Sequence, residues 1–398
     1  MTYPENIKVI IDRLEASGES AYIVGGSLRD MLLGVAPHDY DVTTSALPPK
    51  TLSVFSDMRV IETGIKHGTV TVISCGEPVE VTTFRVDGEY TDSRHPDSIS
   101  FTTSIEEDLA RRDFTVNAMA YSQSRGLIDP FDGTSDVKHG IIRAVGEPRE
   151  RFREDALRIM RAFRFCAQLG FEIEARTLEG AVECAAGLEK IARERIGAEF
   201  IKLLTSPYSE KALELMVRTG VIKYAVGECN VSDELIRIIP QMQEVDVARL
   251  GVLLCRTDVE IARAALGELR CSTKQKKGAL AVALGANTSV NSAEDARRLI
   301  AKTGIYAPYA ARLSEKLGIS GAGAEQLTVK QQNTPCTVGQ LAINGKVLSG
   351  LGARGKSIGK TLDLLLCAVI EDPTLNEEST LIVLAEKILN EMKDGEHV

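Results

Sequence analysis

Apolar and polar positions change their period several times over the first 140 residues. Residues 4–17 predict an amphipathic helix, because Ile7, Ile10 and Ile11 recur at helical spacing. Two short β-rich runs, AYIVGG and YDVTTS, flank a short helix, SLRDMLLG, that ends at Gly34. A helix led by proline, PPKTLSVFS, precedes a hairpin made of GTVTVIS and EPVEVTTFR. These elements predict a small mixed sheet with helices around it.

Helical periodicity dominates from about Ile141 onward, and strand signals nearly vanish there. The expected fold class is therefore α+β: an N-terminal α/β head with a small mixed sheet, followed by a long helical remainder. Residues 86–104, VDGEYTDSRHPDSISFTTS, are polar and have no period, so they predict a mobile loop. GISGAGAEQ predicts a linker between helices, and NGKVLSGLGARGKSIG predicts loops around short helices.

Charge is distributed unevenly along the 398 residues. The formal net charge is −9, which argues against a basic coat over the whole protein. From Ala301 to Lys360, however, eight Lys or Arg stand against two Glu, a local excess of +6. This basic segment is a candidate footprint for a polyanion, with Arg354, Lys356 and Lys360 as the predicted RNA-binding residues. The alternative interpretation is a basic, solvated face with no ligand.

The eight cysteines form no CxxC pair, and several lie in apolar runs such as FRFCAQLGF and LDLLLCAVI. They are interpreted as small core residues in a reducing compartment. The first residues, MTYPENIKVIIDRLEASG, carry early charges and do not predict a signal peptide. No apolar run approaches the length of a membrane span. We therefore expect a soluble, cytoplasmic protein with no membrane partner; the sequence does not determine its oligomeric state.

The stretch YIVGGSLRDMLLGVAPHDYDVTT concentrates the candidate chemistry. Side chains alternate along a strand, so Asp39 and Asp41 are expected on one face. Two carboxylates held that close repel each other unless a cation lies between them. Hard oxygen ligands suit Mg²⁺, and Glu80 in PVEVTTF is a candidate third carboxylate. Three carboxylates can hold two ions, one at the attacking hydroxyl and one at the leaving phosphate.

Gly25 and Gly26 lie between the first strand and the following helix, where a backbone without side chains can approach a phosphate closely. The first amides of that helix, at Ser27, would face the same anion. A lone GG or a lone DxD is a weak signal, because most examples are turns, caps or solvated carboxylates. Their combination at this spacing predicts a nucleotidyl-transfer site with catalytic residues Asp39, Asp41 and Glu80.

A series of longer motifs follows along the chain: GGSLRDMLLG with HDYDVTT, then ETGIKHGTVTV, EEDLARRDFTVNAMAY, IDPFDG, RFREDALRIMRAFRFCAQLGF and ARERIGAEFIKLL. Together these motifs resemble the class II tRNA nucleotidyltransferases, the CCA-adding enzymes, and their poly(A) polymerase relatives. The resemblance is dense from Ala21 to about Leu204 and weaker beyond, where VGQLAINGKVLSG is similar to the tail segment of bacterial members. A His-Asp phosphohydrolase domain is not expected, since the single His-Asp dipeptide is His38-Asp39.

The resemblance implies four parts: a catalytic head over 1–140, a neck that recognises the base over 141–204, a helical body over 205–300 and a tRNA-binding tail over 301–398. It also implies Mg²⁺ as cofactor, with CTP, ATP and the 3′ acceptor end of tRNA as partners. Asp39 and Asp41 match the family's metal-binding aspartates. The predicted nucleotide-binding residues are Gly25, Gly26, Ser27, Arg29, Arg111, Arg112, Asp113, Asn117, Asp155, Arg158 and Arg161.

The EDxxR motif allows a physical account of base recognition. Asp155 and Arg158 are three apart, so they would share one face of a helix. A carboxylate accepts from an exocyclic amine and a guanidinium donates to a ring acceptor, which fits C and A but not U and G. The alternative interpretation is an ion pair within the helix. Likewise, LARRDFTVNAMAY could be a helix end with Asp113 and Thr115 as caps.

The leading functional hypothesis is template-independent addition of C, C and A to tRNA. Poly(A) polymerase and a partial enzyme that adds only CC or only A are the nearest alternatives. The intact run RVDGEYTDSRHPDSISF favours complete CCA addition, because relatives restricted to CC lack part of this loop. A non-catalytic RNA-binding protein is the alternative of a different class, and it would not need Asp39, Asp41 and Glu80.

Overall fold

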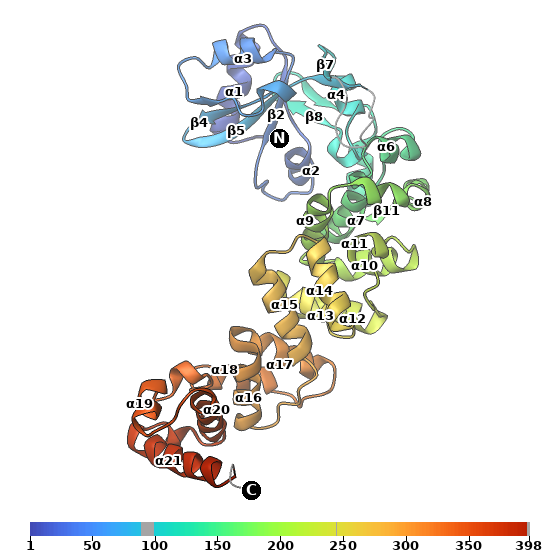
Figure 1. Ribbon diagram of the computed structural model, residues 1–398. Helices are drawn as coiled ribbons and strands as arrows, with labels where there is room; N and C mark the ends of the chain where they lie inside the picture. The colour runs from blue at the N-terminus through green and yellow to red at the C-terminus, as the bar shows by residue number, and fades with distance from the viewer. Residues whose placement is uncertain (89–98, 244, 396–398) are drawn as a thin grey trace. The chain divides into compact units, whose positions relative to one another are not determined.

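The computed structural model describes residues 1–88, 99–243 and 245–395 (Figure 1). The chain divides into two compact units, Met1–Gly227 and Glu228–Val398. Strands occur in the first unit, and the described part of the second is helical. The α+β class with an N-terminal mixed sheet is therefore confirmed. Within the described residues, no helix combines the length and the apolar character that crossing a membrane would require.

A seven-stranded mixed sheet forms the centre of the head, in the order β3-β4-β5-β2-β1-β8-β9. Strands β2 and β5 are parallel, and every other neighbouring pair is antiparallel. The predicted hairpin is the β4–β5 pair. The strands are β1 (Ala21–Val24), β2 (Asp41–Thr44), β3 (Val60–Ile61), β4 (Thr69–Ser74), β5 (Glu77–Thr83), β8 (Ala120–Ser122) and β9 (Gly126–Ile128).

Helix α1 (Glu5–Ala16) contacts β1 and β4 through the apolar face that its sequence predicts. Ile7, Ile10, Ile11 and Leu14 are all buried there. The short α2 follows β1 directly, as predicted, and α3 begins with two prolines in its first turn. The remaining bounds are α2 (Gly26–Leu32), α3 (Pro48–Val54), α4 (Ile105–Ala110), α5 (Gly133–His139), η1 (Ile65–His67) and η2 (Thr115–Asn117).

The segment predicted as a mobile loop is ordered at both ends. Strand β6 (Arg85–Asp87) pairs antiparallel with β7 (Ile99–Phe101). Ser104 then caps α4, its hydroxyl accepting from the backbone N–H of Glu107 at 3.3 Å. The prediction is therefore wrong for these flanks, where residues with β propensity pair across the two ends. The part of the predicted loop over 89–98 lies outside the described residues.

Helices after residue 141 complete the first unit, together with a two-residue parallel pair, β10 (Ile141–Ile142) and β11 (Glu172–Ile173). Phe163 of α7 and Phe200 of α9 are both fully buried, and these two helices pack against each other. The bounds are α6 (Pro148–Glu154), α7 (Leu157–Leu169), α8 (Ala175–Glu183), η3 (Ala185–Lys190), α9 (Arg193–Leu204), α10 (Ser209–Arg218) and α11 (Ile222–Val226).

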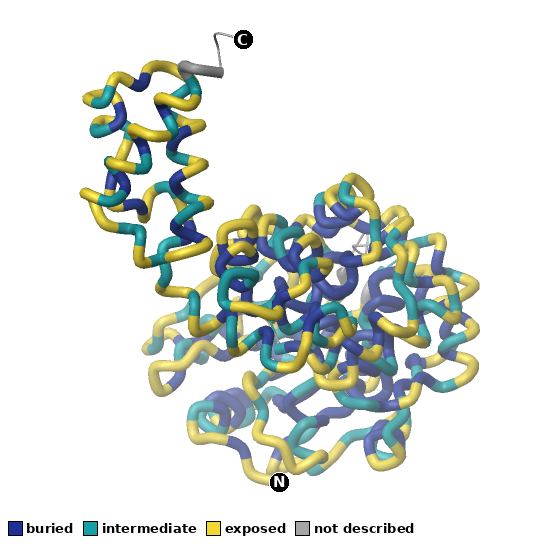
Figure 2. Tube along the Cα trace, turned by 90° about the horizontal axis from the view of Figure 1, so that it is seen from below, coloured by how far each residue is buried: buried dark blue, intermediate teal, exposed yellow. Residues whose placement is uncertain are grey.

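The second unit is built from amphipathic helices, in which buried and exposed positions alternate (Figure 2). Its helices are α12 (Asp233–Ile238), η4 (Ile239–Gln241), α13 (Asp246–Leu254), α14 (Val259–Glu268), α15 (Thr273–Gly285), α16 (Ala293–Thr303), η5 (Gly304–Tyr306), α17 (Ala307–Lys316), α18 (Ala324–Gln331), η6 (Val338–Gln340), α19 (Gly345–Gly350), α20 (Lys356–Glu371), η7 (Pro373–Leu375) and α21 (Glu378–Gly395).

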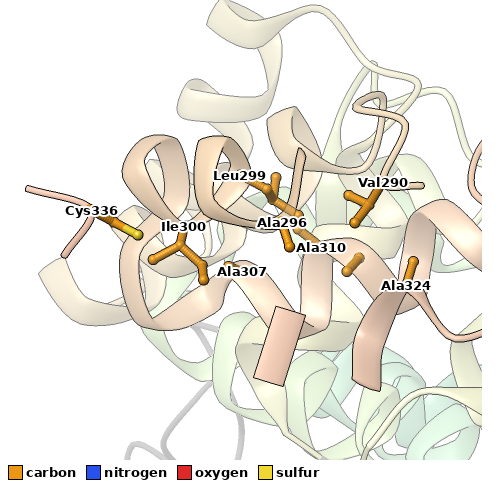
Figure 3. Packing of buried hydrophobic residues seen from close by; sticks show 9 residues of the cluster. Val290, Ala296, Leu299, Ile300, Ala307, Ala310, Ala324 and Cys336 are labelled. Carbon is orange, nitrogen blue, oxygen red and sulfur yellow. The ribbon is translucent and has the colours of Figure 1, made fainter. Parts of the chain in front are cut away.

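Small side chains dominate one core of this unit, where α16, α17 and α18 meet (Figure 3). Ala296, Ala307 and Ala310 are fully buried, with Leu299 packed among them. A core of alanines brings helix backbones close together and suits a chain without Trp. The linker predicted at GISGAGAEQ joins α17 to α18, although its last three residues already belong to α18. The Gly-rich basic segment contains the short α19, as expected.

All eight cysteines are free thiols. Cys166 in FRFCAQLGF is buried on α7, as its apolar setting predicts. Cys75 and Cys367 are exposed, the latter in LDLLLCAVI on α20, so the interpretation as core residues is wrong for these two. Consecutive apolar residues of a helix point in all directions around its axis, so some side chains of LDLLLCAVI must face solvent.

Candidate active site

The glycine turn joins β1 to α2. Gly25 has φ +72° and ψ −137°, a conformation open only to glycine. A Cβ at Gly25 would lie 3.3 Å from Nη1 of Arg112, so the missing side chain leaves space for this guanidinium. Ser27 is buried, and its hydroxyl donates to the carbonyl oxygen of Val24 at 3.0 Å. The turn thus places a cation against bare backbone at the N-terminus of α2.

Carboxylates gather at the start of β2. Asp41 is in register with Glu80 across the parallel β2–β5 pair. Asp39 precedes the strand, so the argument from alternation along a strand does not apply to it. Desolvation, repulsion from Glu80 and then repulsion from Asp39 raise the pKa of Asp41, and Arg112 opposes them. Glu80 and Asp39 therefore both act electrostatically on Asp41.

The donor chemistry of these carboxylates fits Mg²⁺, which prefers hard oxygen ligands. A cation would relieve the repulsion that raises the pKa of Asp41. Over residues 1–88, 99–243 and 245–395, no three His, Cys, Asp or Glu side chains are already arranged as a metal-binding group.

A buried hydrogen-bond network lies behind the glycine turn. Asn117 donates from Nδ2 to Oδ1 of Asp113 at 3.2 Å and accepts at Oδ1 from Nη1 of Arg29 at 2.8 Å. Arg161 of α7 donates from Nε to Oδ2 of Asp113 at 2.7 Å. Burial alone would raise the pKa of Asp113, but Arg161 and the hydrogen bonds lower it to about 2. Asp113 thus joins a side chain of η2 to one of α7, and it caps no α-helix.

These groups border one cavity of about 450 Å³ in the first unit. Its lining residues are Gly25, Gly26, Arg29, Asp41, Arg111, Arg112, Asp113, Asn117, Asp155, Leu157, Arg158, Arg161, Arg164, Phe165, Gln168 and Arg195. The cavity brings together eleven residues that the sequence predicts, whereas Asp39, Glu80 and Ser27 do not line it. Seven arginines against three aspartates make the lining strongly attractive to anions.

The sequence analysis missed five lining residues: Leu157, Arg164, Phe165, Gln168 and Arg195. Phe165 and Gln168 continue the helical face of α7 that carries Arg158 and Arg161, so their spacing was a usable signal. Arg195 comes from α9 and had no such signal.

Phe165 is the centre of an arginine cluster. Its ring centroid lies 3.9 Å from the guanidinium carbon of Arg164, 5.3 Å from that of Arg161 and 5.4 Å from that of Arg29. Contacts of this kind stabilise cations over an aromatic ring. One aromatic side chain therefore helps to hold three positive charges near the cavity.

Asp155 and Arg158 do not share one helix face. Helix α6 ends at Glu154 and α7 begins at Leu157, so Asp155 is extended between them, with φ −139° and ψ 102°. The predicted geometry is wrong, because Asp155 lies outside both helices. Its side chain accepts from the backbone N–H of Leu157, the first residue of α7, at 3.0 Å. Its other oxygen accepts from Nη2 of Arg195 at 3.0 Å.

Arg158 is held by different groups. Its Nη1 donates to Oε2 of Glu154 at 2.7 Å, and its Nη2 donates to the carbonyl oxygen of Arg111 at 2.9 Å. The ion pair between Asp155 and Arg158 that was the alternative interpretation is therefore not formed. Both side chains nevertheless line the cavity, Asp155 from the break between α6 and α7 and Arg158 from the first turn of α7.

A second cavity, of about 730 Å³, lies in the other unit between α20 and α21. Its lining residues are Gly352, Ala353, Arg354, Lys356, Ser357, Lys360, Leu364, Ile388, Leu389, Glu391 and Met392. All three predicted RNA-binding residues are among them, so they lie on one surface.

Comparisons with known proteins match this architecture. Residues 21–143 match the family model described as the poly A polymerase head domain, and residues 170–229 match the probable RNA and SrmB-binding site of polymerase A. The fold and the site therefore define a nucleotidyltransferase of the poly(A) polymerase head type.

Full-length similarity is more specific. The chain is 38% identical to the CCA-adding enzyme of Leuconostoc mesenteroides, over 96% of each chain. It is 36% identical to that of Pediococcus pentosaceus, over 96% of this chain and 98% of the relative. The crystal structure of the Bacillus stearothermophilus CCA-adding enzyme in complex with CTP matches with a TM-score of 0.82 and 32% identity, over 98% of this chain and 100% of that one. The chain belongs to the family of CCA-adding enzymes.

Proposed function

We propose that this protein adds C, C and A to the 3′ end of tRNA without a template, using CTP and ATP and releasing pyrophosphate. The observation that carries the proposal is the single cavity, in which an arginine-rich lining meets the carboxylate of Asp41. Triphosphates need cations, and nucleotidyl transfer needs a metal-binding carboxylate beside them. The CCA-adding enzymes of similar length, one of them in complex with CTP, support the choice of substrates.

We assign Asp39 and Asp41 to the binding of Mg²⁺, with Glu80 as the third carboxylate. Bound Mg²⁺ supplies activation of the attacking 3′-hydroxyl and stabilisation of the leaving pyrophosphate. The register of Asp41 with Glu80 supports this assignment, as does the repulsion that raises the pKa of Asp41.

The arginines that line the cavity of the first unit are assigned to binding the nucleotide's phosphates. Arg111 and Arg112 line the cavity, and Arg112 lies against Gly25 at the N-terminus of α2. A triphosphate placed there meets guanidinium groups and bare backbone together. Asp113 and Asn117 are buried acceptors and donors beside them, suited to the hydroxyls of a ribose.

Base selection is assigned to Asp155 and Arg158. A carboxylate has about four lone-pair sites, so Asp155 can accept from an exocyclic amine while it also accepts from Arg195. Arg158 supplies the donor for the ring acceptor that C and A share. U and G have the opposite polarity and would leave these groups unpaired, which is costly in an enclosed site.

The cavity between α20 and α21, called the tail cavity below, is assigned to binding the RNA. Arg354, Lys356 and Lys360 lie together at its lining, as phosphate contacts require. We also propose the division into head, neck, body and tail at residues 140, 204 and 300, and action in the cytoplasm, where tRNA and nucleoside triphosphates meet.

Poly(A) polymerases share the head domain, so the reaction products must distinguish poly(A) synthesis from CCA addition. Purified protein is incubated with tRNA that lacks its 3′ CCA, with CTP, ATP, UTP and GTP singly and with CTP plus ATP, and the products are sequenced. We expect CC from CTP alone and CCA from both. Runs of A from ATP alone would establish a poly(A) polymerase, and CC as the product of the CTP–ATP mixture would establish a partial enzyme. No addition by folded protein that binds tRNA would indicate a non-catalytic RNA-binding protein.

A further inference from the structure

Asp108 of α4 is a fully buried carboxylate, with an exposed fraction of 0%, and it does not line the active-site cavity. Aspartates are almost never buried to this degree unless they are paired. Its position therefore requires partners that compensate for the loss of water.

Two arginines provide that compensation. Arg111 donates to Oδ1 of Asp108 from Nε at 3.0 Å and from Nη2 at 2.8 Å. Arg112 donates from Nη2 to Oδ2 at 3.2 Å. Burial favours the neutral acid, but the two guanidinium groups outweigh it and keep the pKa of Asp108 below its ordinary value. The carboxylate is therefore ionised at neutral pH and bound by both arginines at once.

Both arginines extend from this buried anchor to the cavity, where each is 18% exposed. The guanidinium of Arg112 lies against Gly25 and acts on the carboxyl of Asp41. Its Nε is buried and has no acceptor among the residues that the structure describes. The protein thus leaves part of the hydrogen-bonding capacity of Arg112 unused at the point where the glycine turn meets the carboxylates.

Asp108 also reaches two strands of the head. Its Oδ1 accepts from the backbone N–H of Arg85 in β6 at 3.3 Å, and its Oδ2 lies 3.5 Å from Oγ1 of Thr43 in β2. Thr43 is two residues after Asp41 in the same strand. The anchor is therefore fixed to the strand that carries the catalytic carboxylate as well as to α4.

We propose that Asp108 is a positioning residue, which orders Arg111 and Arg112 in advance for the phosphates of the incoming nucleotide. The inference rests on the proposed function of the cavity. Long arginine side chains lose conformational freedom when they bind a ligand, and an anchor that fixes them beforehand reduces that loss. Asp108 would then determine affinity for the triphosphate without touching it.

The test compares the binding of CTP and CMP, which differ only in the two outer phosphates. The substitution Asp108→Asn keeps the shape of the side chain and removes its charge. We expect the affinity for CTP to fall about tenfold or more and the affinity for CMP to change by less than about twofold. An equal loss for both ligands, or no loss for either, would show that Asp108 has only a structural role.

Asp136→Asn is the matched control. Asp136 is a second buried aspartate of the head, 5% exposed, that accepts from Thr115 and is paired with Arg143. Neither partner lines the cavity. The control should preserve the ratio of CTP to CMP affinity even if it lowers the melting temperature. A control that reduces this ratio as much as Asp108→Asn would overturn the specific role.

A mutant cycle with the double variant Arg111→Ala/Arg112→Ala tests whether Asp108 acts through the two arginines. If it does, adding Asp108→Asn should cost little more CTP affinity than Arg111→Ala/Arg112→Ala alone, whereas additive losses would contradict the proposal. If Asp108→Asn fails to fold, Asp108→Glu keeps the charge, moves the carboxylate by one methylene and should give the same selective loss of CTP affinity; an unchanged CTP-to-CMP ratio there would equally overturn the role. A wild-type protein that binds CTP no tighter than CMP would overturn the proposed nucleotide site itself.

Discussion

Asp41 and Glu80 face each other in register across the one parallel pair of strands in the head sheet, β2 and β5. Residues 39 positions apart along the chain thereby become neighbours, and the repulsion between them contributes to the raised pKa of Asp41. Two neighbouring carboxylates repel each other unless a cation lies between them, and the first prediction rests on this repulsion.

Asp39→Ala and Asp41→Ala should each reduce nucleotide incorporation by about a hundredfold or more, because metal-bound oxygens supply several kcal/mol of transition-state stabilisation. The fold and tRNA binding should persist. Asp12→Ala is the control, since Asp12 lies on α1 in an exposed pair with Lys8. Incorporation is measured with saturating Mg²⁺, and normal rates for both variants would contradict the metal assignment.

Asp113→Asn should destabilise the first unit in a pH-dependent manner. The folded-state pKa of Asp113 is about 2, below its ordinary value of 3.8, so its ionisation stabilises the fold above the unfolded-state pKa. This contribution is about 2 kcal/mol and disappears as the pH falls from about 4 toward 2. Denaturant unfolding at several pH values checks the difference between wild type and variant. A difference that stays constant from pH 6 to pH 3 would refute the contribution of this ionised group.

Changing Arg354, Lys356 and Lys360 to Glu should weaken tRNA binding and flatten its salt dependence. Each lost phosphate contact should reduce the slope of log K against log salt by about 0.7 to 0.9. Lys277→Glu, an exposed lysine of α15 outside both the basic segment 301–360 and the tail cavity, is the matched control. Filter binding from low to high salt gives the slopes. If the triple variant keeps the wild-type slope, the basic segment is only a solvated face.

Asp155→Asn should relax discrimination against UTP, because its amide can donate to the carbonyl that the carboxylate repels. Incorporation of C and of A should both slow, since both bases present the same edge. The ratio of kcat/KM for CTP and UTP should fall about tenfold or more. Arg176→Lys is a control on the exposed surface of α8, where Arg176 pairs with Glu147. Full rejection of UTP by the Asp155 variant would assign base selection to other residues.

The sequence determined most of the local structure and the identity of the candidate site. Helix α1, strands β1 and β2 and the β4–β5 hairpin follow from apolar period, and the glycine turn follows from GG between a strand and a helix. Period and turn residues are local properties, so a short window of sequence contains them. Eleven of the predicted residues line one cavity. They could be predicted because they belong to long motifs in a fixed order.

Only the tertiary structure decided how those residues pair. EDxxR suggested one helix, but Asp155 lies in the break before α7 and accepts from Arg195, which lies 40 positions further along the chain. The strands β6 and β7 have three residues each and are too short to be recognised until each has the other as partner. Asp108 shows the same limit: its sequence setting is an ordinary helix turn, yet it is buried among groups from α4, β2 and β6. A buried charge depends on partners that meet only when the chain folds, and its environment is therefore a property of packing rather than of local sequence.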